Sequence, residues 1–356
     1  MRIVNIILTS VNGGAEQVFI DYLVALKNLG HEILAVTKLD APYADEVEKL
    51  GIKVKKITNN LGYHDIFAIS NLRNILQEFD ADIVISHAGR AISLSKKAVK
   101  KITSKKIIKV AVNHSMNVKR SIGSDIILSV NKEIFFRTID AGQREDSSFI
   151  ISNAIDLTDS DIDVPKVNLQ KKEEIVIGVM GRLDESKGFY DVIRSIKILE
   201  KLSDKKFILK IAGSGLIEPK LRSLVKKLDL ENKVEFCGWI KSKKDFFSSI
   251  DIFLLSSKSE TFGLVLLEAM KYFKPIISTD ADGPKEILRD KQDALIVPLK
   301  PSKNIDERIA NAVIEMVDNP DAMNLMVENS AARVREKFSY ESLENKLREI
   351  VGSAVI

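Results

Sequence analysis

The feature that most constrains the fold is an alternation of short apolar runs with segments of helical spacing, and it occurs twice along the 356 residues. The first run, residues 3–8, is apolar except for Asn5, as strands buried on both faces of a parallel sheet are. A glycine-bearing loop follows, and apolar residues then recur at helical spacing over residues 15–28, with Gly30 after the last turn. This alternation predicts an α/β fold with mostly parallel strands.

A polar, charged, proline-containing stretch at residues 156–174 separates two series of predicted strands. The first series is predicted at residues 3–8, 32–37, 53–57, 83–86, 107–113, 126–130 and 148–151. The second series is predicted at residues 175–180, 207–212, 234–237, 252–256, 275–279 and 294–297. A chain of this length suits two domains. We expect one Rossmann-like domain at 1–165, a second at 166–338, and a C-terminal helical segment, 339–356, that packs back toward the first.

Composition excludes several classes of protein. The excess of 54 basic over 50 acidic residues is too small to indicate nucleic-acid binding. The single cysteine, Cys237, cannot form a disulfide within the chain, which suits a reducing cytosol. The apolar N-terminus is short and lacks a cleavage pattern, so we expect a first strand and a cytoplasmic protein. The four histidines and one cysteine show no paired metal-ligand spacing, so we predict no metal site.

Two loops at predicted strand ends carry residues suited to binding anions. Gly13 and Gly14 lie between the first strand and the first helix, where backbone N–H groups can approach a phosphate, although a tight turn explains them equally well. Arg182 and Lys187 follow the first strand of the second half, where guanidinium and ammonium groups would grip phosphate oxygens. The alternative is solvated loop charges, and the position at a strand end favours phosphate binding.

A third segment, residues 256–270, combines a predicted helix start with two carboxylates. The helix begins near Gly263 and leaves the backbone N–H groups around Phe262 and Leu264 available to a diphosphate. Glu260 precedes the helix and Glu268 lies inside it, and both suit hydrogen bonds from sugar hydroxyls. Glu268 has apolar neighbours in the sequence, so we expect it to be buried with a partner such as a ribose diol.

Glu260 and Glu268, eight positions apart, resemble the paired-glutamate motif of retaining family 4 glycosyltransferases, which have the GT-B fold. Other segments resemble that family's motifs in the same order. They are Gly13-Gly14, Asn153-Ala154-Ile155-Asp156, Gly181 to Gly188, Gly213-Ser214-Gly215 and Asp282 to Ile287. The resemblance covers essentially the whole chain and implies two Rossmann-like domains facing across a cleft, with the nucleotide sugar on the second domain and the acceptor on the first.

The family's roles carry over to matching positions. The resemblance implies that His114 and Glu260 act on the donor sugar. It implies that the donor is held by Gly14, Arg182, Lys187, Phe262, Gly263, Leu264 and Glu268. His114 is equally well explained as a capping residue at a strand end. We expect His87, which ends another strand, to line the acceptor side.

A lysine-rich segment, Lys96 to Lys109, places Lys96, Lys97, Lys100 and Lys101 on one helical face. A solvated helix face is one explanation, and docking on an anionic membrane surface is the functional one. No aromatic residues interleave with the lysines, which argues against nucleic acid. We therefore expect a peripheral location on the inner face of the cell membrane.

The resemblance predicts a hexosyltransferase that uses a UDP- or GDP-linked sugar as substrate, needs no metal or other cofactor, and serves lipopolysaccharide or other envelope glycan synthesis. Three alternatives stay open at this point. A nucleotide-sugar 2-epimerase has the same fold. A nicotinamide dehydrogenase is disfavoured because no G-x-G-x-x-G segment is present in the first loop. A non-catalytic nucleotide-sugar-binding subunit is disfavoured by the presence of the charged residues.

Overall fold

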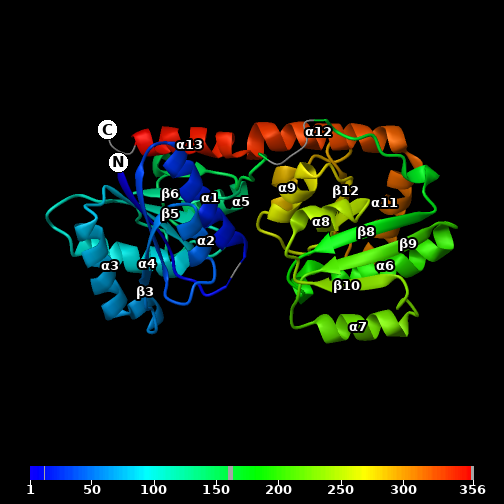
Figure 1. Ribbon diagram of the computed structural model, residues 1–356, viewed down its shortest axis with the longest axis horizontal. Helices are drawn as coiled ribbons and strands as arrows, with labels where there is room; N and C mark the ends of the chain where they lie inside the picture. Colours follow the sequence, from blue (N-terminus) through cyan, green and yellow to red (C-terminus); the bar gives the residue numbers. More distant parts are fainter. Residues whose placement is uncertain (12, 159–162, 354–356) are drawn as a thin grey trace. The chain divides into compact units, whose positions relative to one another are not determined.

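The structure, a computed structural model, describes residues 1–11, 13–158 and 163–353. Asn12 of the first glycine loop and residues 159–162 of the expected connection lie outside the described residues. The chain divides into two compact units (Figure 1). The first consists of Met1–Ile155 together with Phe338–Ile356, and the second of Asp156–Lys337.

The first unit contains a parallel sheet whose strands are β1 Arg2–Ile7, β2 Glu32–Lys38, β3 Lys53–Ile57, β4 Ile83–His87, β5 Ile108–Asn113, β6 Ile126–Ser129 and β7 Ser148–Ile150. Its helices are α1 Gly14–Asn28, α2 Ala44–Lys49, α3 Ile66–Glu78, α4 Ala88–Lys100, α5 Lys132–Asp140 and α13 Tyr340–Ser353, with a short 3-10 turn, η1 Gly62–His64, before α3. The strand order is β3-β2-β1-β4-β5-β6-β7.

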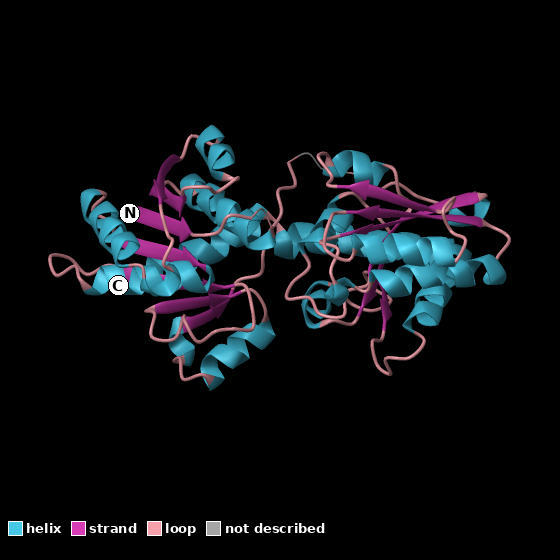
Figure 2. Cartoon of the chain, turned by 90° about the horizontal axis from the view of Figure 1, so that it is seen from below, coloured by secondary structure: helices cyan, strands magenta, loops and turns pink. Residues whose placement is uncertain are grey.

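Successive side chains along β1 and β4 point to opposite faces of this sheet. Val4, Ile6 and Val84 pack with the apolar residues of α3 and α4. Asn5, one residue out of phase, faces α1 instead and donates a hydrogen bond to the carbonyl oxygen of Phe19. The sheet is therefore covered by helices on both faces (Figure 2), which explains why its inner strands are mostly apolar.

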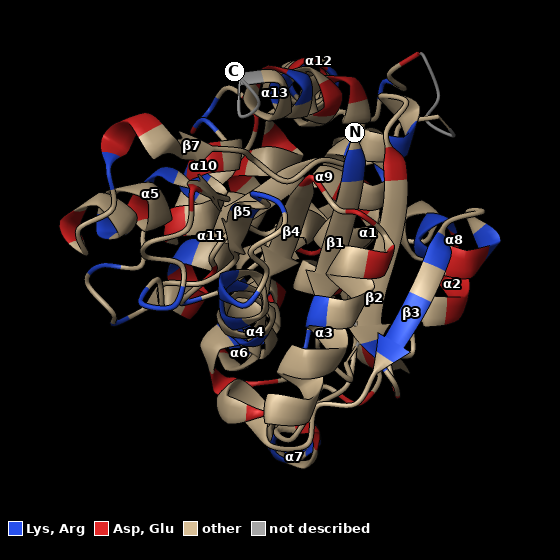
Figure 3. Ribbon diagram, turned by 90° about the vertical axis from the view of Figure 1, so that its left-hand side faces the viewer, with Lys and Arg blue, Asp and Glu red and all other residues tan. Residues whose placement is uncertain are grey.

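The edge strand β3 protects the open side of this sheet. Lys53, Lys55 and Lys56 lie along it and show as blue ribbon in Figure 3. Lysines on an edge strand discourage pairing with another chain.

The second unit contains a parallel sheet of β8 Glu174–Met180, β9 Lys206–Ala212, β10 Val234–Gly238, β11 Ile252–Leu255, β12 Ile276–Thr279 and β13 Leu295–Val297, in the order β10-β9-β8-β11-β12-β13. Its helices are α6 Phe189–Leu202, α7 Glu218–Lys227, α8 Lys243–Ser248, α9 Leu264–Lys271, α10 Asp282–Ile287, α11 Ile305–Asp318 and α12 Pro320–Phe338. Every strand predicted from the sequence is confirmed, with ends that differ by about one residue.

The second unit begins at Asp156, not at residue 166 as expected. The reason is that part of the polar connection is anchored to this unit. Val164 packs against Phe273 and its apolar neighbours on α12. The backbone N–H of Val167 donates to the side chain of Asn324 (2.9 Å), and Lys271 donates to the carbonyl oxygen of Asp156 (2.8 Å).

The C-terminal helix α13 belongs to the first unit. The Ser339 hydroxyl accepts a hydrogen bond from the Ser342 backbone N–H (3.3 Å) and so caps the N-terminus of this helix. The Tyr340 hydroxyl donates to Asp21 on α1 (2.7 Å), which joins the two helices. No helix in the described ranges is both long and apolar enough to cross a membrane.

Candidate functional site

The second sheet brings two of the predicted loops together at its topological switch point. The strands β8 and β11 are neighbours although β9 and β10 lie between them in sequence. In open parallel sheets, ligands bind beyond the carboxyl ends of the strands at such a point. The loops that leave those two ends, residues 181–188 and 256–263, carry Lys187 and Glu260.

Lys187 and Glu260 form an ion pair across the two loops. The Nζ atom of Lys187 lies 2.6 Å from the Oε2 atom of Glu260, and both side chains are mostly buried. Two further hydrogen bonds of 2.7 Å connect the loops, from the Ser256 hydroxyl to the carbonyl oxygen of Lys187 and from the Lys258 N–H to that of Ser186. The pair is therefore held by the backbones on both sides of it.

Gly188 permits this close approach. Its φ angle is +70°, and a Cβ atom there would lie 2.0 Å from the carbonyl oxygen of Ser256. Gly283 likewise permits a close backbone approach at the far end of the loop 256–263. A Cβ atom on Gly283 would lie 2.5 Å from the Phe262 nitrogen. The Gly283 N–H donates to the carbonyl oxygen of Glu260 (2.9 Å). Larger residues at either position would move the loops apart.

Arg182 lies in the same loop as Lys187, but its guanidinium is exposed and its Nε donates to Asp184 (2.9 Å). Asp184 also caps the short turn that carries Lys187, because its carboxylate accepts a hydrogen bond from the Ser186 N–H (2.9 Å). Burial opposes ionisation of Asp184, but the hydrogen bonds from Ser186 and Arg182 together lower its pKa. Arg182 is thus tethered beside the pair without contacting it.

The helix α9 begins at Leu264, with Gly263 as its N-cap and Phe262 buried just before it. The first-turn N–H groups of a helix have no intrahelical acceptors, so this end favours anions.

Glu268, in the middle of α9, is mostly buried, and its Oε1 atom accepts a hydrogen bond from the Lys243 ammonium of α8. Burial of Glu268 with a partner was expected from the sequence, but Lys243 was not predicted as that partner. Nothing in the sequence around Ser242 and Lys243 signals this contact.

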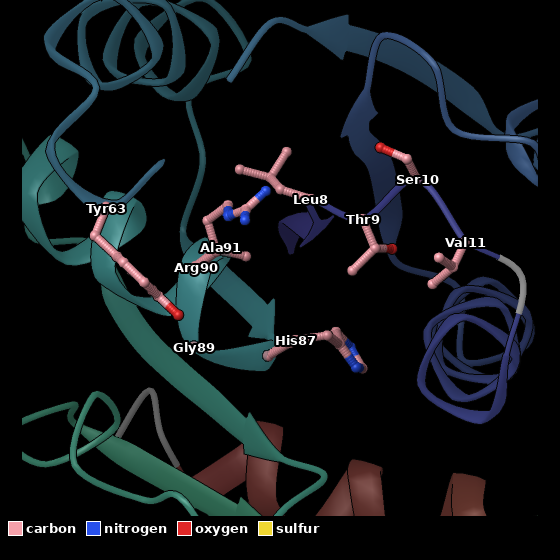
Figure 4. Close-up of a pocket in the computed structure, with 10 residues that line it drawn as sticks. Leu8, Thr9, Ser10, Val11, Tyr63, His87, Gly89, Arg90 and Ala91 are labelled. Atoms are coloured by element: carbon pink, nitrogen blue, oxygen red, sulfur yellow. The ribbon is translucent and has the colours of Figure 1, made fainter. Parts of the chain in front are cut away.

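The first unit has its own pocket at its switch point, between the carboxyl ends of β1 and β4. The pocket has a volume of about 400 Å³ and is lined by Leu8, Thr9, Ser10, Val11, Tyr63, His87, Ala88, Gly89, Arg90 and Ala91 (Figure 4). Arg90, in the first turn of α4, has no ion-pair partner within the described part of the chain. Tyr63 and Arg90 were not predicted from the sequence as site residues.

Gly14 is the first residue of α1, so the helix begins one residue earlier than expected. Glu16, two residues later, is buried, and a Cβ atom on Gly13 would lie 3.2 Å from its carboxylate. A glutamate at the third helical position with its carboxylate near the N-cap places a negative charge at the positive end of the helix. The chain itself therefore supplies an anion at the N-terminus of α1.

His87 lines the pocket at the end of β4, but its side chain packs into the interior of the first unit. Alternation along β4 turns its side chain toward α1, where Phe19 and Tyr22 contact the imidazole edge-on, and the side chain is fully buried. In Figure 4 the ring points away from Tyr63 and Arg90. The Nδ1 atom of His87 lies 3.0 Å from the Nε2 atom of His114, which follows β5.

Both histidines are held in the neutral form. Burial, helped by the adjacent His114, keeps the pKa of His87 well below its ordinary value. Burial also lowers the pKa of His114 to about 4. A neutral imidazole pair shares one hydrogen bond, so the tautomer of one ring fixes the tautomer of the other.

The lysine-rich segment is only partly available to a surface. Lys96 and Lys97 are half-buried and donate to carbonyl oxygens at Ile122 and Tyr63. Lys105 and Lys109 form ion pairs with Asp82 and Asp125 (both 2.6 Å). The lysines of this segment that stay exposed are Lys100, Lys101 and Lys106. Among the described residues, no group of three or more His, Cys, Asp or Glu side chains is placed to hold a metal.

Comparisons with known proteins agree with this division into two units. A profile described as "Glycosyltransferase Family 4" matches residues 12–158, and one described as "Glycosyl transferases group 1" matches residues 160–333. The chain is 24% identical over 345 residues to a lipopolysaccharide core biosynthesis glycosyltransferase, LpsE, of Rhizobium meliloti, with 96% of each chain covered. It is 26% identical to an uncharacterized glycosyltransferase of Haemophilus influenzae, covering 95% of this chain and 96% of the other.

Solved structures show the same fold. The structure of Anabaena HepE in complex with UDP-glucose superposes with a TM-score of 0.82 at 19% identity, covering 99% of this chain and 100% of the other. The lipopolysaccharide outer core galactosyltransferase WaaB superposes with a TM-score of 0.77 at 19% identity, covering 99% of both chains. The expected GT-B class, two α/β units with parallel sheets, is confirmed.

Proposed function

Since the chain belongs to the glycosyltransferases whose family 4 and group 1 profiles match its two units, we propose that it moves a sugar from a nucleoside diphosphate to a hydroxyl acceptor with retention of configuration. Glycosyl transfer is the activity of this family, and the retaining outcome and the substrates are the proposed part. The observation that carries the proposal is the Lys187–Glu260 ion pair at the switch point of the second sheet, beside the N-terminus of α9.

The second unit binds the donor. As the glycosidic bond breaks, negative charge develops on the departing diphosphate, and preorganised cations and N–H groups stabilise it best. Lys187 and the first-turn N–H groups of α9 supply these donors, and the exposed Arg182 guanidinium turns from Asp184 to the phosphates. This set of charges makes a metal ion unnecessary, so transfer should continue in the presence of a chelator.

Glu260 and Glu268 contact the sugars of the donor. Glu260, with one oxygen on Lys187, accepts hydrogen bonds from hydroxyls of the transferred sugar. Glu268 accepts hydrogen bonds from the ribose, and Lys243 orients its carboxylate for this. Phe262, Gly263 and Leu264 present their backbone to the phosphates. Gly14 has a smaller role, because the Glu16 carboxylate already lies at the N-terminus of α1.

The first unit binds the acceptor in the pocket between β1 and β4, and His114 hydrogen-bonds the transferred sugar. The acceptor hydroxyl attacks the anomeric carbon on the face from which the diphosphate leaves. The bond from the anomeric carbon to the diphosphate oxygen breaks, the bond to the acceptor oxygen forms, and the acceptor proton passes to the departing diphosphate. Glu260 is engaged with Lys187, which favours this route over a covalent intermediate on that carboxylate.

The similar proteins suggest both substrates. HepE has been crystallised with UDP and with UDP-glucose, so a UDP-linked hexose is the proposed donor. LpsE acts in lipopolysaccharide core biosynthesis, so the proposed acceptor is a lipid-linked envelope glycan. This acceptor places the enzyme on the cytoplasmic face of the membrane, with Lys100, Lys101 and Lys106 facing anionic lipid.

A panel of UDP- and GDP-sugars tests the donor by thermal shift, because a bound donor raises the melting temperature by mass action. The preferred donor is then incubated with and without acceptor, and the products are identified by NMR. Retained configuration at the new bond supports the proposal, and an inverted product contradicts it. Epimerised donor in the absence of acceptor would identify an isomerase, and binding without turnover over all acceptors would identify a binding subunit.

A further inference from the structure

The pocket of the first unit contains a cation that the chain itself does not neutralise. Arg90 lines this pocket, is half-buried, and has no ion-pair partner in the described part of the chain. No Asp or Glu side chain is among the described residues that line the pocket. The hydroxyl of Ser10, another lining residue, donates to Asp40 (3.0 Å), but that carboxylate is paired with Lys38 (3.1 Å). The charge of the pocket therefore favours an anionic ligand.

The turn between β4 and α4 brings Arg90 to this pocket. The strand ends at His87 and the helix begins at the next residue, Ala88, so no loop separates the two elements. Ala88 has a φ angle of +64°, a left-handed conformation that costs a residue with a Cβ atom about 1–3 kcal/mol. Strained backbone of this kind is concentrated at binding and catalytic sites. The strain therefore lies where it places the Arg90 guanidinium at the carboxyl edge of the sheet.

Two further donors border the same pocket. The Tyr63 hydroxyl has no hydrogen-bond partner among the described residues, and in Figure 4 it points toward Gly89 at the start of α4. The Arg120 guanidinium lies over the Tyr63 ring, 4.3 Å from its centroid, and has no ion-pair partner within the described ranges. A Cβ atom on Gly89 would lie 3.4 Å from the Arg120 side chain and 3.9 Å from the Tyr63 hydroxyl. The start of α4 and these two side chains are therefore neighbours.

Two half-buried lysines of α4 hold these segments in place. Lys97 donates to the carbonyl oxygen of Tyr63 (2.6 Å). Lys96 donates to the carbonyl oxygens of Ile122 and Arg120, the latter at 3.4 Å. These bonds tie η1 and the loop after β5 to the helix that carries Arg90. A site whose walls are already ordered loses less conformational entropy when a ligand binds.

We propose that Arg90 and the Tyr63 hydroxyl bind an oxyanion carried by the acceptor, a phosphate or a carboxylate, and that Arg120 adds a second positive charge. A guanidinium meets either group with two parallel hydrogen bonds, which give direction as well as affinity. A pocket of about 400 Å³ lies within the range of small-ligand sites. The inference rests on the proposed function in taking this pocket as the acceptor site, and it makes the acceptor an acidic glycan instead of a neutral one.

Three sugars that differ only in the group at carbon 6 test the oxyanion site: glucose 6-phosphate, glucuronate and glucose. Their binding to the full chain is measured by isothermal titration calorimetry, with UDP in excess so that the donor loops are occupied. The better of the two acids should bind about tenfold more tightly than glucose, the scale of one hydrogen-bonded charge pair. Whether that acid is the phosphate or the carboxylate identifies the group that the acceptor carries.

Substitutions assign this preference to its residues. Arg90→Gln should abolish the preference for the acid. Arg90→Lys should keep part of it, because the charge remains but the paired hydrogen bonds are lost. Tyr63→Phe should reduce it about threefold, the scale of one neutral hydrogen bond. Arg137→Gln, which removes an exposed arginine on α5 of the same unit, is the matched control and should bind like the unmodified chain.

Several outcomes overturn the oxyanion site. They are equal affinities of the unmodified chain for all three sugars, an equal loss in the Arg137 variant, and a preference that disappears in Lys187→Ala but persists in Arg90→Gln. The last result would place the anion in the second unit. If Arg90→Gln melts several degrees lower than the unmodified chain, Tyr63→Phe decides, because it removes a single oxygen atom. If UDP and UDP-glucose give no thermal shift but the preference still depends on Arg90, the proposed donor is wrong and the oxyanion site stands.

Discussion

The Nδ1 atom of His87 lies 3.0 Å from the Nε2 atom of His114, and the two rings are stacked with 18° between their planes. The other nitrogen of His87, Nε2, is buried and has no hydrogen-bond partner in the part of the chain that the structure describes. A buried N–H without an acceptor is less tolerable than a buried acceptor without a donor. His87 therefore donates from Nδ1, and His114 presents its own Nδ1–H at the carboxyl end of β5.

Replacing His87 tests this arrangement. His87→Leu removes the donor and should lower kcat for transfer about tenfold, because a residue that orients a functional imidazole through a hydrogen bond typically contributes on this scale. His87→Asn places an amide N–H near the position of Nδ1 and should recover most of the activity. The chain has only four histidines, so 15N spectra of labelled protein can report the tautomer of His114 directly. Equal activity in the Leu and Asn variants would contradict the positioning role.

The depressed pKa of His114 predicts an acid-sensitive first unit. The unfolded imidazole has a pKa of about 6.5 and the folded one about 4, so between these values the unfolded chain binds more protons. Stability is therefore complete above pH ~6.5 and falls as the pH drops toward 4. At pH ~5 the loss from His114 alone should be roughly 2 kcal/mol. Amide hydrogen exchange in the first unit measures it, and His114→Gln should show a shallower pH dependence. Parallel curves would exclude His114 as the cause.

The Lys187–Glu260 pair should matter far more for catalysis than for folding. Glu260→Gln and Lys187→Ala should each lower kcat for transfer by about 10²–10³, the scale for losing one preorganised group at a developing charge. The melting temperature should change by only a few degrees, since the pair retains some solvent contact. Lys220→Ala, which breaks an exposed pair with Glu185, serves as the control and should leave both quantities unchanged. Turnover close to normal in the first two variants would remove them from the active site.

Lys243 should affect donor binding through Glu268. Lys243→Ala leaves the mostly buried Glu268 carboxylate without this cation and should weaken binding of the nucleotide sugar about tenfold, close to the effect of Glu268→Gln. Lys244→Ala, at the next position of α8, is the matched control. Trp239, the single tryptophan, is exposed just after β10 in the same unit and offers a fluorescence signal for the titration. Equal affinities for the two lysine variants would contradict the coupling.

Gly188→Ala should disrupt the donor site by moving its loops. The new Cβ atom would lie 2.0 Å from the Ser256 carbonyl oxygen at a φ angle of +70°, so we expect a loss of about 2–4 kcal/mol of stability together with donor binding. Gly181→Ala is the control, because nothing lies within 4 Å of its added Cβ atom. Chemical denaturation and UDP-glucose binding measure both effects. A Gly188 variant as stable as the Gly181 variant would contradict the close approach.

The strands and their parallel arrangement could be predicted from the sequence because burial on both faces of a sheet leaves a direct mark, a continuous apolar run between turn residues. The loops after β8 and β11 could be predicted to lie at the same edge of the sheet. In a parallel sheet with helical crossovers, the carboxyl ends of the strands all lie at one edge. A local signal, Gly263, also identified the start of α9.

Contacts between side chains far apart in sequence were decided only by the tertiary structure. The face on which His87 lies depends on the phase of β4, and its partner depends on the register between β4 and β5. The Lys243–Glu268 pair and the anchoring of Val164 arise from packing between elements that carry no mark of each other. Hydrophobic periodicity records whether a residue is buried, but only the packed chain determines which residue it meets there.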